Sequence, residues 1–354
     1  MEKLHLTGLK EEELESFVES CGQRRFRANQ LFKQIHSRRL LDFKEMSDLP
    51  VNFRDQLRQI AVASTLRIES KFLSADGTRR YLMKTTDDLP VETVFIPSEG
   101  RDTICFSSQS GCPLKCDFCL TARLGLLRSL SAGEIVEQII LVLNDVYGVG
   151  AKTPHGTNLV AMGAGEPFLN FENLMKALEI ISSKNGLFIV PSRVTVSTAG
   201  IVPKIYEFAK LKRRPNLAVS LLATNDALRN KLMPINRRWN IEELMKAVKQ
   251  VEGSLRRGED LTFEYVLLKD VNDSIHHANE LVDLIKRHSL NRVKVNLIPH
   301  NTADILSYEP PSEQTILQFQ KVLRENGIAN YIRRPRGRDI YAACGQLAAR
   351  TILD

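Results

Sequence analysis

Several features are scarce or missing in this 354-residue sequence, and each absence removes a class of protein. No apolar run approaches the roughly 18 residues that a membrane-spanning helix needs, so we expect no membrane segment. The N-terminal residues Met1-Glu-Lys-Leu-His-Leu lack the apolar stretch of a signal peptide, and we expect a cytoplasmic location. The six cysteines are too few and too clustered for a disulfide scaffold, which favours metal binding or catalysis.

The bulk composition is that of an ordinary globular protein. Hydrophobic residues make up 43% of the chain and charged residues 26%, so it can bury a normal core. The length predicts one large domain or two smaller ones. A net charge of +7 suits a polyanionic partner, although many basic proteins bind no nucleic acid.

The first 100 residues divide by their hydrophobic period. Residues 1–62 read as helical, with an apolar stripe in Phe26–His36 and a helix pair between Phe43 and Leu57 that breaks at Pro50. Residues 63–100 read as a small antiparallel β unit, with a hairpin turn at Asp76-Gly77.

From residue 101 onward, short apolar strands alternate with amphipathic helices. This alternation predicts an α/β fold with a parallel sheet, either open or closed into a partial or full barrel. Active sites of such folds lie at the C-terminal ends of the strands, where polar, glycine-containing motifs occur at 163–167 and 197–200. The expected strands are 102–107, 158–163, 193–197, 217–222, 261–268, 292–298 and 328–333, and the expected helices 131–147, 171–184, 241–253, 276–288 and 312–326.

Three cysteines occupy one stretch of eight residues, as Cys112, Cys116 and Cys119. Three thiolates can hold three irons of a [4Fe–4S] cluster and leave the fourth iron open to a small molecule, whereas a cluster that only carries electrons normally has four cysteines. The alternative is a tetrahedral zinc site, although no second paired CxxC or HxxxH motif follows. Its fourth ligand would come from Cys105, His155 or Cys344.

The CxxxCxxC spacing after a first strand resembles the radical S-adenosylmethionine (SAM) enzymes, and Phe118 fits that family's aromatic position before the last cysteine. In that family the open iron chelates SAM, which is cleaved to a 5′-deoxyadenosyl radical. Taken by itself, the segment Gly163-Ala-Gly-Glu166-Pro167 fits a ligand-binding motif and an ordinary strand-to-helix turn with a carboxylate equally well. Beside the triad it resembles the motif that holds the methionyl amine.

Five further motifs are Pro90–Pro97, Cys105–Cys112, Leu232–Asn236, Val295–Pro299 and Ala342–Leu347. Together they resemble the RlmN/Cfr family of RNA adenine methyltransferases, and the match extends from about residue 20 to residue 350. The resemblance implies a radical SAM partial (β/α) barrel at 101–354, a helical RNA-binding accessory domain at 1–62 and a β linker unit at 63–100.

The same resemblance implies a two-stage methyl transfer. Read alone, Cys344 and Cys105 are expected to be buried core cysteines. In the family, the cysteine that matches Cys344 takes a methyl group from one SAM, and a second SAM supplies the radical. Cys105 then forms a transient disulfide with Cys344, and Glu92 is the general base. The positions that match SAM contacts are Gly165, Glu166, Ser197, Ser220, Leu221, Leu222 and Asn296.

The Glu166-Pro167 pair is typical of the RlmN branch, which methylates carbon 2 of adenine in 23S rRNA and in the tRNA anticodon loop. Carbon-8 methylation and a zinc-stabilised RNA-binding protein are the alternatives. Ala164 and Leu222 depart from the family pattern, which has methionine and histidine there. We also expect a flavodoxin-like electron donor and a monomer.

Basic clusters that could contact RNA phosphates are Arg24, Arg25 and Arg27; Lys212, Arg213 and Arg214; Arg237 and Arg238; and Arg333, Arg334, Arg336 and Arg338.

Overall fold

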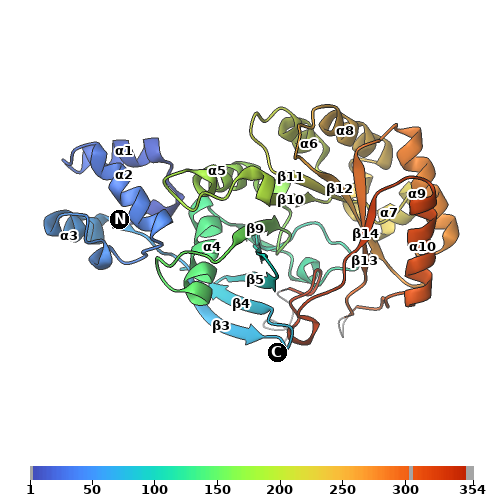
Figure 1. Cartoon of the computed structure of the whole chain (residues 1–354), viewed down its shortest axis with the longest axis horizontal. Helices are drawn as coiled ribbons and strands as arrows, with labels where there is room; N and C mark the ends of the chain where they lie inside the picture. Colours follow the sequence, from blue (N-terminus) through green and yellow to red (C-terminus); the bar gives the residue numbers. More distant parts are fainter. Residues whose placement is uncertain (1–2, 303–305, 348–354) are drawn as a thin grey trace.

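The computed structural model describes residues 3–302 and 306–347, and a curved ten-stranded sheet runs through them (Figure 1). The strand order is β14-β13-β12-β11-β10-β9-β6-β5-β4-β3. Strands from β6 to β14 pair in parallel, and β3 to β6 pair antiparallel. Their bounds are β3 Arg67–Leu73, β4 Arg79–Lys84, β5 Pro90–Ser98, β6 Arg101–Cys105, β9 Gly156–Ala161, β10 Val194–Thr198, β11 Asn216–Ser220, β12 Leu261–Leu267, β13 Val293–Pro299 and β14 Asn330–Ile332.

Helices follow the parallel strands and cover the outside of the sheet, as Figure 1 shows for α8, α9 and α10. Each parallel strand and each helix expected from residue 101 onward is present, with ends shifted by a few residues. Two short helices, α6 and α7, were not predicted, because segments of eight and seven residues carry little periodicity. The bounds are α4 Ala132–Tyr147, α5 Phe171–Ser182, α6 Val202–Ala209, α7 Asp226–Leu232, α8 Ile241–Gly253, α9 Ile275–Arg287 and α10 Glu313–Glu325.

The sheet does not close on itself within the described residues. β14 and β3 are its two ends, so the parallel part forms a partial barrel, as predicted. The antiparallel unit with its Asp76-Gly77 turn is also present, and it continues the barrel sheet because β5 pairs with β6 in the register Val94↔Cys105. This continuity places Glu92 and Cys105 on neighbouring strands.

The N-terminal helices form a lobe at one end of the molecule (Figure 1). Pro50 is the N-cap of α3, so the break lies where it was expected. The first helix of the expected pair is wrong, because Phe43–Glu45 form only a short 3₁₀ turn and the turn-forming residues Ser47 and Asp48 follow. The lobe docks on α4, where the Glu137 carboxylate accepts hydrogen bonds from the backbone amides of Thr65 and Leu66, each at 2.9 Å. Its apolar side chains belong to the same buried cluster as those of α4. The elements are β1 Leu4–His5, α1 Glu11–Ser20, α2 Phe26–Phe32, α3 Val51–Ile60 and β2 Ala61–Val62.

The expected boundaries at 62 and 100 fall at the end of β2 and between β5 and β6. The first two residues of the unit expected at 1–62, and the last seven of the unit expected at 101–354, lie outside the described residues. Within the described ranges no helix is long and apolar enough to cross a membrane.

Candidate active site

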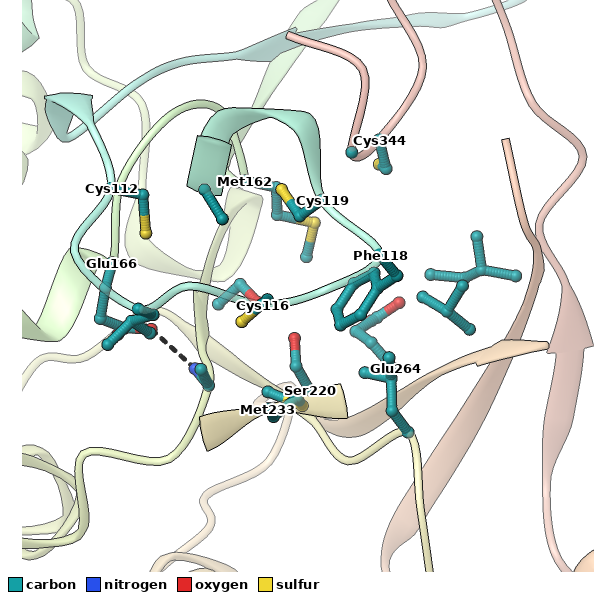
Figure 2. A pocket seen from close by; sticks show the side chains of 18 of the residues that line it. Cys112, Cys116, Phe118, Cys119, Met162, Glu166, Ser220, Met233, Glu264 and Cys344 are labelled. Atoms are coloured by element: carbon teal, nitrogen blue, oxygen red, sulfur yellow. Dashed lines mark hydrogen bonds between the residues drawn. The ribbon is translucent and has the colours of Figure 1, made fainter. Parts of the chain in front are cut away.

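An open cavity at the C-terminal ends of the parallel strands gathers most of the expected site residues (Figure 2). The space between its atoms, open solvent included, is about 1010 Å³. Expected residues in its lining are Cys112, Cys116, Cys119, Gly165, Glu166, Ser197, Ser220, Leu222 and Cys344.

The three-cysteine loop connects two short strands, β7 (Gln109–Gly111) and β8 (Leu126–Ser129). The Cys112 amide donates to the Gly125 carbonyl at 2.8 Å, and the Asp117 amide donates to the Leu232 carbonyl at 3.1 Å. Gly111 has φ +75°, and a Cβ there would lie 1.9 Å from the Gly125 oxygen, so a side chain is excluded. These contacts fix the loop so that all three thiols line one cavity.

The environment of the three thiols fits an iron–sulfur cluster. Burial raises the pKa of each, to about 12 for Cys112, with mutual repulsion between their charged forms as a further cause for Cys112 and Cys116. The three thiols are therefore neutral at pH 7 in the absence of a metal, and a bound cationic cluster would lower their pKa values and hold them as thiolates. In a cluster, each of the three would bind a different iron.

A single zinc ion fits the same residues poorly. Among the described residues, no three His, Cys, Asp or Glu side chains converge closely enough to hold one metal ion. His155, one of the possible fourth ligands, instead lies with Nε2 2.9 Å from Asp102 Oδ2, near the N-terminal end of β6. The cysteine loop lies at the opposite ends of the strands.

Glu166 lies at the start of a short 3₁₀ turn after β9. Its Oε1 accepts from the Phe168 amide at 3.0 Å. Its Oε2 accepts from the Ala199 amide at 2.7 Å, which is the dashed line in Figure 2. Gly165 before it has φ +102°, and a Cβ there would lie 2.6 Å from Gln109 Cβ. Burial raises the pKa of Glu166 to about 7. A bound ammonium group would favour the ionised form of this carboxylate.

Two of the expected SAM contacts do not line this cavity. Ser220 and Leu222 line it, whereas the Leu221 side chain between them is fully buried in the core. Asn296 is also absent from the lining, and its Nδ2 donates to Glu264 Oε1 at 2.8 Å. The structure therefore brings Glu264, which was not predicted, to the cavity wall in place of Asn296.

Cys344 joins this cavity to a second one. The second cavity is lined by Cys344 and Cys105, together with Val160 and Met162 from the β9 region. Cys344 is exposed, whereas Cys105 is buried. Burial raises the pKa of the Cys105 thiol to about 12, and the nearby Cys344 adds to the shift. The two cysteines that read alone as core residues therefore share one cavity, and one of them is open to solvent.

Hydrogen bonds hold the Cys344 segment against the three-cysteine loop. The Leu120 amide donates to the Gly345 carbonyl at 2.9 Å. Asn301 Nδ2 donates to the Cys344 carbonyl at 3.1 Å, and Ser74 Oγ donates to Asp339 Oδ1 at 2.6 Å. The segment is thus fixed on three sides, by the cysteine loop, the end of β13 and the β3–β4 hairpin.

Comparison with known proteins agrees with this arrangement. Residues 4–63 match the ribosomal RNA large subunit methyltransferase N-terminal domain, and residues 106–285 match the radical SAM superfamily. A probable dual-specificity RNA methyltransferase RlmN from Koribacter versatilis is 45% identical, over 93% of this chain and 97% of the relative. The RlmN of Francisella tularensis subsp. novicida is 40% identical, over 98% and 93%. The chain belongs to the RlmN family of radical SAM RNA methyltransferases.

A solved structure supports the fold of this RlmN-family protein over nearly its whole length. A radical SAM methyltransferase from Sphaerobacter thermophilus superposes with a TM-score of 0.92 at 38% identity, covering 98% of this chain and 99% of that one. The predicted class, a SAM-dependent methyltransferase with a radical SAM fold, is confirmed. The family implies a [4Fe–4S] cluster and SAM, which the three-cysteine loop and the cavity beside it fit.

Glu92, the base expected from the RlmN family, lines neither of these two cavities. Its Oε1 accepts from Arg80 Nη1 at 2.8 Å, and its Oε2 is buried without a hydrogen-bond partner in the part of the chain that the structure describes. Burial raises the pKa of Glu92 to about 7, while Arg80 opposes the rise. Because Val94 pairs with Cys105, and side chains two apart on a strand share a face, Glu92 projects from the same face as Cys105.

The basic clusters differ in their environments. Arg333, Arg334 and Arg336 line the second cavity, beside Cys344. Arg214 is instead buried, where it pairs with Glu259 at 2.8 Å, so it is not available for RNA. The C-terminal cluster is therefore the one that the fold brings to the cysteine pair.

Three residues in the lining of the main cavity were not predicted from the sequence as site residues: Glu264, Met162 and Met233. Glu264 had a visible signal, because it is the one charged residue in the expected strand Leu261–Leu268. Met162 and Met233 had none, since a methionine in a strand or turn is usually core packing.

Proposed function

We propose that this protein methylates carbon 2 of an adenine in 23S rRNA and in the tRNA anticodon loop, with the methyl group carried on Cys344. The observation that carries the proposal is the position of Cys344. It lines the cavity of the three-cysteine loop and also the cavity of Cys105. One side chain thus reaches both the SAM site and its disulfide partner.

The first stage is a displacement at Cys344. Its thiolate attacks the methyl carbon of SAM, the carbon–sulfur bond of the sulfonium breaks, and S-adenosylhomocysteine leaves. When bound, the [4Fe–4S] cluster with a second SAM supplies the radical that removes one hydrogen atom from this methyl group. Two SAM molecules are therefore used per turnover. Glu166 and the neighbouring lining residues orient SAM in the cavity.

The second stage uses Glu92 and Cys105. After the carbon on Cys344 has bonded to the adenine ring, Glu92 removes the ring proton, and one electron returns from the adduct to the redox centre that supplied the radical. The Cys105 thiolate attacks the sulfur of Cys344, the bond between this sulfur and the transferred carbon breaks, and a disulfide forms. The carbon takes up a proton, and the methylated base is released. Support for these roles comes from the cavity that the two cysteines share, and from the common face of Glu92 and Cys105.

RNA would approach from the side of the second cavity, whose lining includes Arg334 and Arg336. The N-terminal lobe is similar to a domain of ribosomal RNA methyltransferases, which supports a role in binding folded RNA. A flavodoxin-like reductant, a monomeric state and a cytoplasmic location complete the proposal.

Modified-nucleoside analysis tests the proposal directly. RNA from cells that lack the gene, and from cells complemented with wild type or Cys344→Ala, is digested and analysed by mass spectrometry, separately for ribosomal RNA and tRNA. We expect 2-methyladenosine to disappear from both fractions and to return only with wild type. Unchanged 2-methyladenosine contradicts the proposal, and a loss of 8-methyladenosine instead indicates carbon-8 specificity.

A further inference from the structure

Arg229 on α7 is an arginine in the interior of the protein, and it is the largest fully buried side chain among the described residues. Its guanidinium donates to three backbone carbonyls, those of Leu221, Ala199 and Ser220, at 3.1, 2.7 and 3.0 Å, and to Asn236 Oδ1 at 2.9 Å. None of these acceptors within the described residues is charged. A buried charge that only neutral dipoles surround is costly unless an anion nearby compensates it.

The carboxylate of Asp226 lies on the same helix but is engaged elsewhere. Its Oδ1 accepts from Asn236 Nδ2 at 2.8 Å and from the Ile241 amide at 2.9 Å. Asn236 therefore stands between the two charges, with its amide oxygen bonded to Arg229 and its amide nitrogen bonded to Asp226. This bridge is what the asparagine of the Leu232–Asn236 motif provides, and it keeps the carboxylate from accepting directly from the guanidinium.

The fold brings Arg229 next to the three-cysteine loop. The Asp117 amide, one residue after Cys116, donates at 3.1 Å to the carbonyl of Leu232, the last residue of α7. Leu232 is less than one helical turn from Arg229, whose own carbonyl accepts from the Met233 amide at 2.7 Å. The loop is thus bonded directly to the helix that carries the buried arginine.

The charges of Arg229 and Cys116 act on each other. Figure 2 shows Cys116 on the part of the loop that faces Ser220, whose carbonyl accepts from Arg229. Burial lowers the pKa of Arg229 to about 10, and a thiolate at Cys116 opposes this more strongly than Asp226 does. Burial likewise raises the pKa of Cys116, and Arg229 is the charge that opposes that rise. Arg229 is therefore protonated at pH 7, and a thiolate at Cys116 is the main anion that acts on it.

A cluster bound through three thiolates has the charge that this cation requires. The thiolates together carry more negative charge than the oxidised [4Fe–4S] core carries positive charge, and reduction adds one more electron. The reduction potential of such a cluster depends on its net charge, its hydrogen bonds and its burial. In a buried site of low dielectric constant, a fixed positive charge stabilises the reduced, more negative state more than the oxidised state.

We propose that Arg229 is the fixed counter-charge of the iron–sulfur cluster and raises its reduction potential. The electron comes from the external reductant, and the cluster that receives it is reduced by one electron. The inference rests on the proposed use of Cys112, Cys116 and Cys119 as cluster ligands. Arg229 contacts neither SAM nor RNA in this role; it acts through its charge, while its hydrogen bonds hold the ends of β10 and β11.

Three changes separate the charge of Arg229 from its hydrogen bonds. Arg229→Met removes both, whereas Arg229→Lys keeps the charge and loses most of the bonds. The double substitution Asp226→Asn with Asn236→Asp exchanges an amide and a carboxylate, so that a carboxylate accepts directly from the guanidinium at constant net charge. The matched control is Arg214→Met, which removes another buried arginine, one that pairs with Glu259 at 2.8 Å just before the start of β11.

A redox titration followed by electron paramagnetic resonance measures the potential of the anaerobically reconstituted protein, without SAM and without RNA. Iron and sulfide analysis shows whether each variant holds the cluster. At the wild-type midpoint, Arg229→Met should have an about tenfold lower ratio of reduced to oxidised cluster, a shift of about 59 mV for one electron. The double substitution should lower the ratio about 3-fold, and Arg229→Lys and Arg214→Met should stay within about 2-fold of wild type.

A wild-type ratio in Arg229→Met overturns the inference, and so does an equal decrease in Arg229→Lys, which assigns the effect to the hydrogen bonds. If Arg229→Met does not fold or holds no cluster, the double substitution decides, because it keeps the guanidinium; a wild-type ratio there is again contrary to the inference. Loss of the cluster from both, but not from Arg229→Lys, supports it, whereas loss from all three contradicts it. A wild type without iron and sulfide overturns the cluster site itself.

Discussion

Replacing Arg80 with glutamine tests the proposed base, because Arg80 is the group that keeps Glu92 ionisable near neutral pH. Glu92 is buried, and its pKa is raised to about 7 even with Arg80 Nη1 at 2.8 Å. A general base works in its ionised form, so methylation should rise as the pH increases through this pKa. Removing the guanidinium raises the pKa further and moves the rise to higher pH.

The size of the shift follows from the bond that is lost. A hydrogen bond to a charged group contributes about 1.5–3 kcal/mol, which corresponds to about 1–2 pKa units. The ionised fraction of Glu92 at pH 7 then falls from about one half to about 7% or less, so the rate should fall about 7-fold to 80-fold. At pH 9 about 40–90% of the rate should return.

The assay is single-turnover methylation with protein that already carries the methyl group on Cys344, with saturating RNA, SAM and reductant, between pH 6 and pH 9.5. Arg79→Gln is the matched control, because Arg79 is the neighbour on β4 and lies 3.4 Å from Asp145 instead of Glu92. Its profile should match wild type. If the methylation rate of Arg80→Gln rises over the same pH range as that of wild type, the role of Glu92 as a base tuned by Arg80 is refuted.

Three further substitutions address other parts of the site. Cys344→Ala should abolish turnover, and intact-protein mass spectrometry should find no methyl adduct; RNA methylation above background contradicts the proposal. Cys105→Ala should trap a protein–RNA crosslink on denaturing gels, and normal product release would exclude the resolving role. Gly165→Ala should destabilise the protein by about 1–3 kcal/mol in urea unfolding, since a Cβ would lie 2.6 Å from Gln109 Cβ and φ is +102°. Gly253→Ala, where a Cβ meets nothing within 4 Å, is the control and should be neutral or slightly stabilising; equal stability of the two variants would contradict the steric argument.

The secondary structure followed from local patterns. Alternating apolar strands and amphipathic helices predicted every parallel strand, because side-chain period reports directly which face of an element is buried. The Asp76-Gly77 turn and the break at Pro50 were equally local, since both depend on the φ preference of one residue. The short helix α7 gave no such signal.

The site residues also fall into two groups, those that a local motif predicts and those that only the fold brings together. The cysteine loop was predicted from the residues themselves, because its three ligands lie within eight positions and the loop brings them together whatever the rest of the chain does. Cys105 and Cys344 were not, since each alone resembles a core cysteine and only the family resemblance suggested their roles. Their shared cavity depends on the packing of β6 against a C-terminal segment from the far end of the chain.

The sequence by itself therefore determined the order of strands and helices, the three-cysteine loop and, through its motifs, the family. The tertiary structure alone decided which side chains meet. It left the sheet unclosed, with β14 and β3 as its two ends, exposed Cys344 to two cavities, and put Glu264 on the wall where Asn296 was expected. The physical reason is that a strand's period fixes the face of a residue, whereas the neighbour across a cavity depends on the curvature of the sheet and the path of the crossovers.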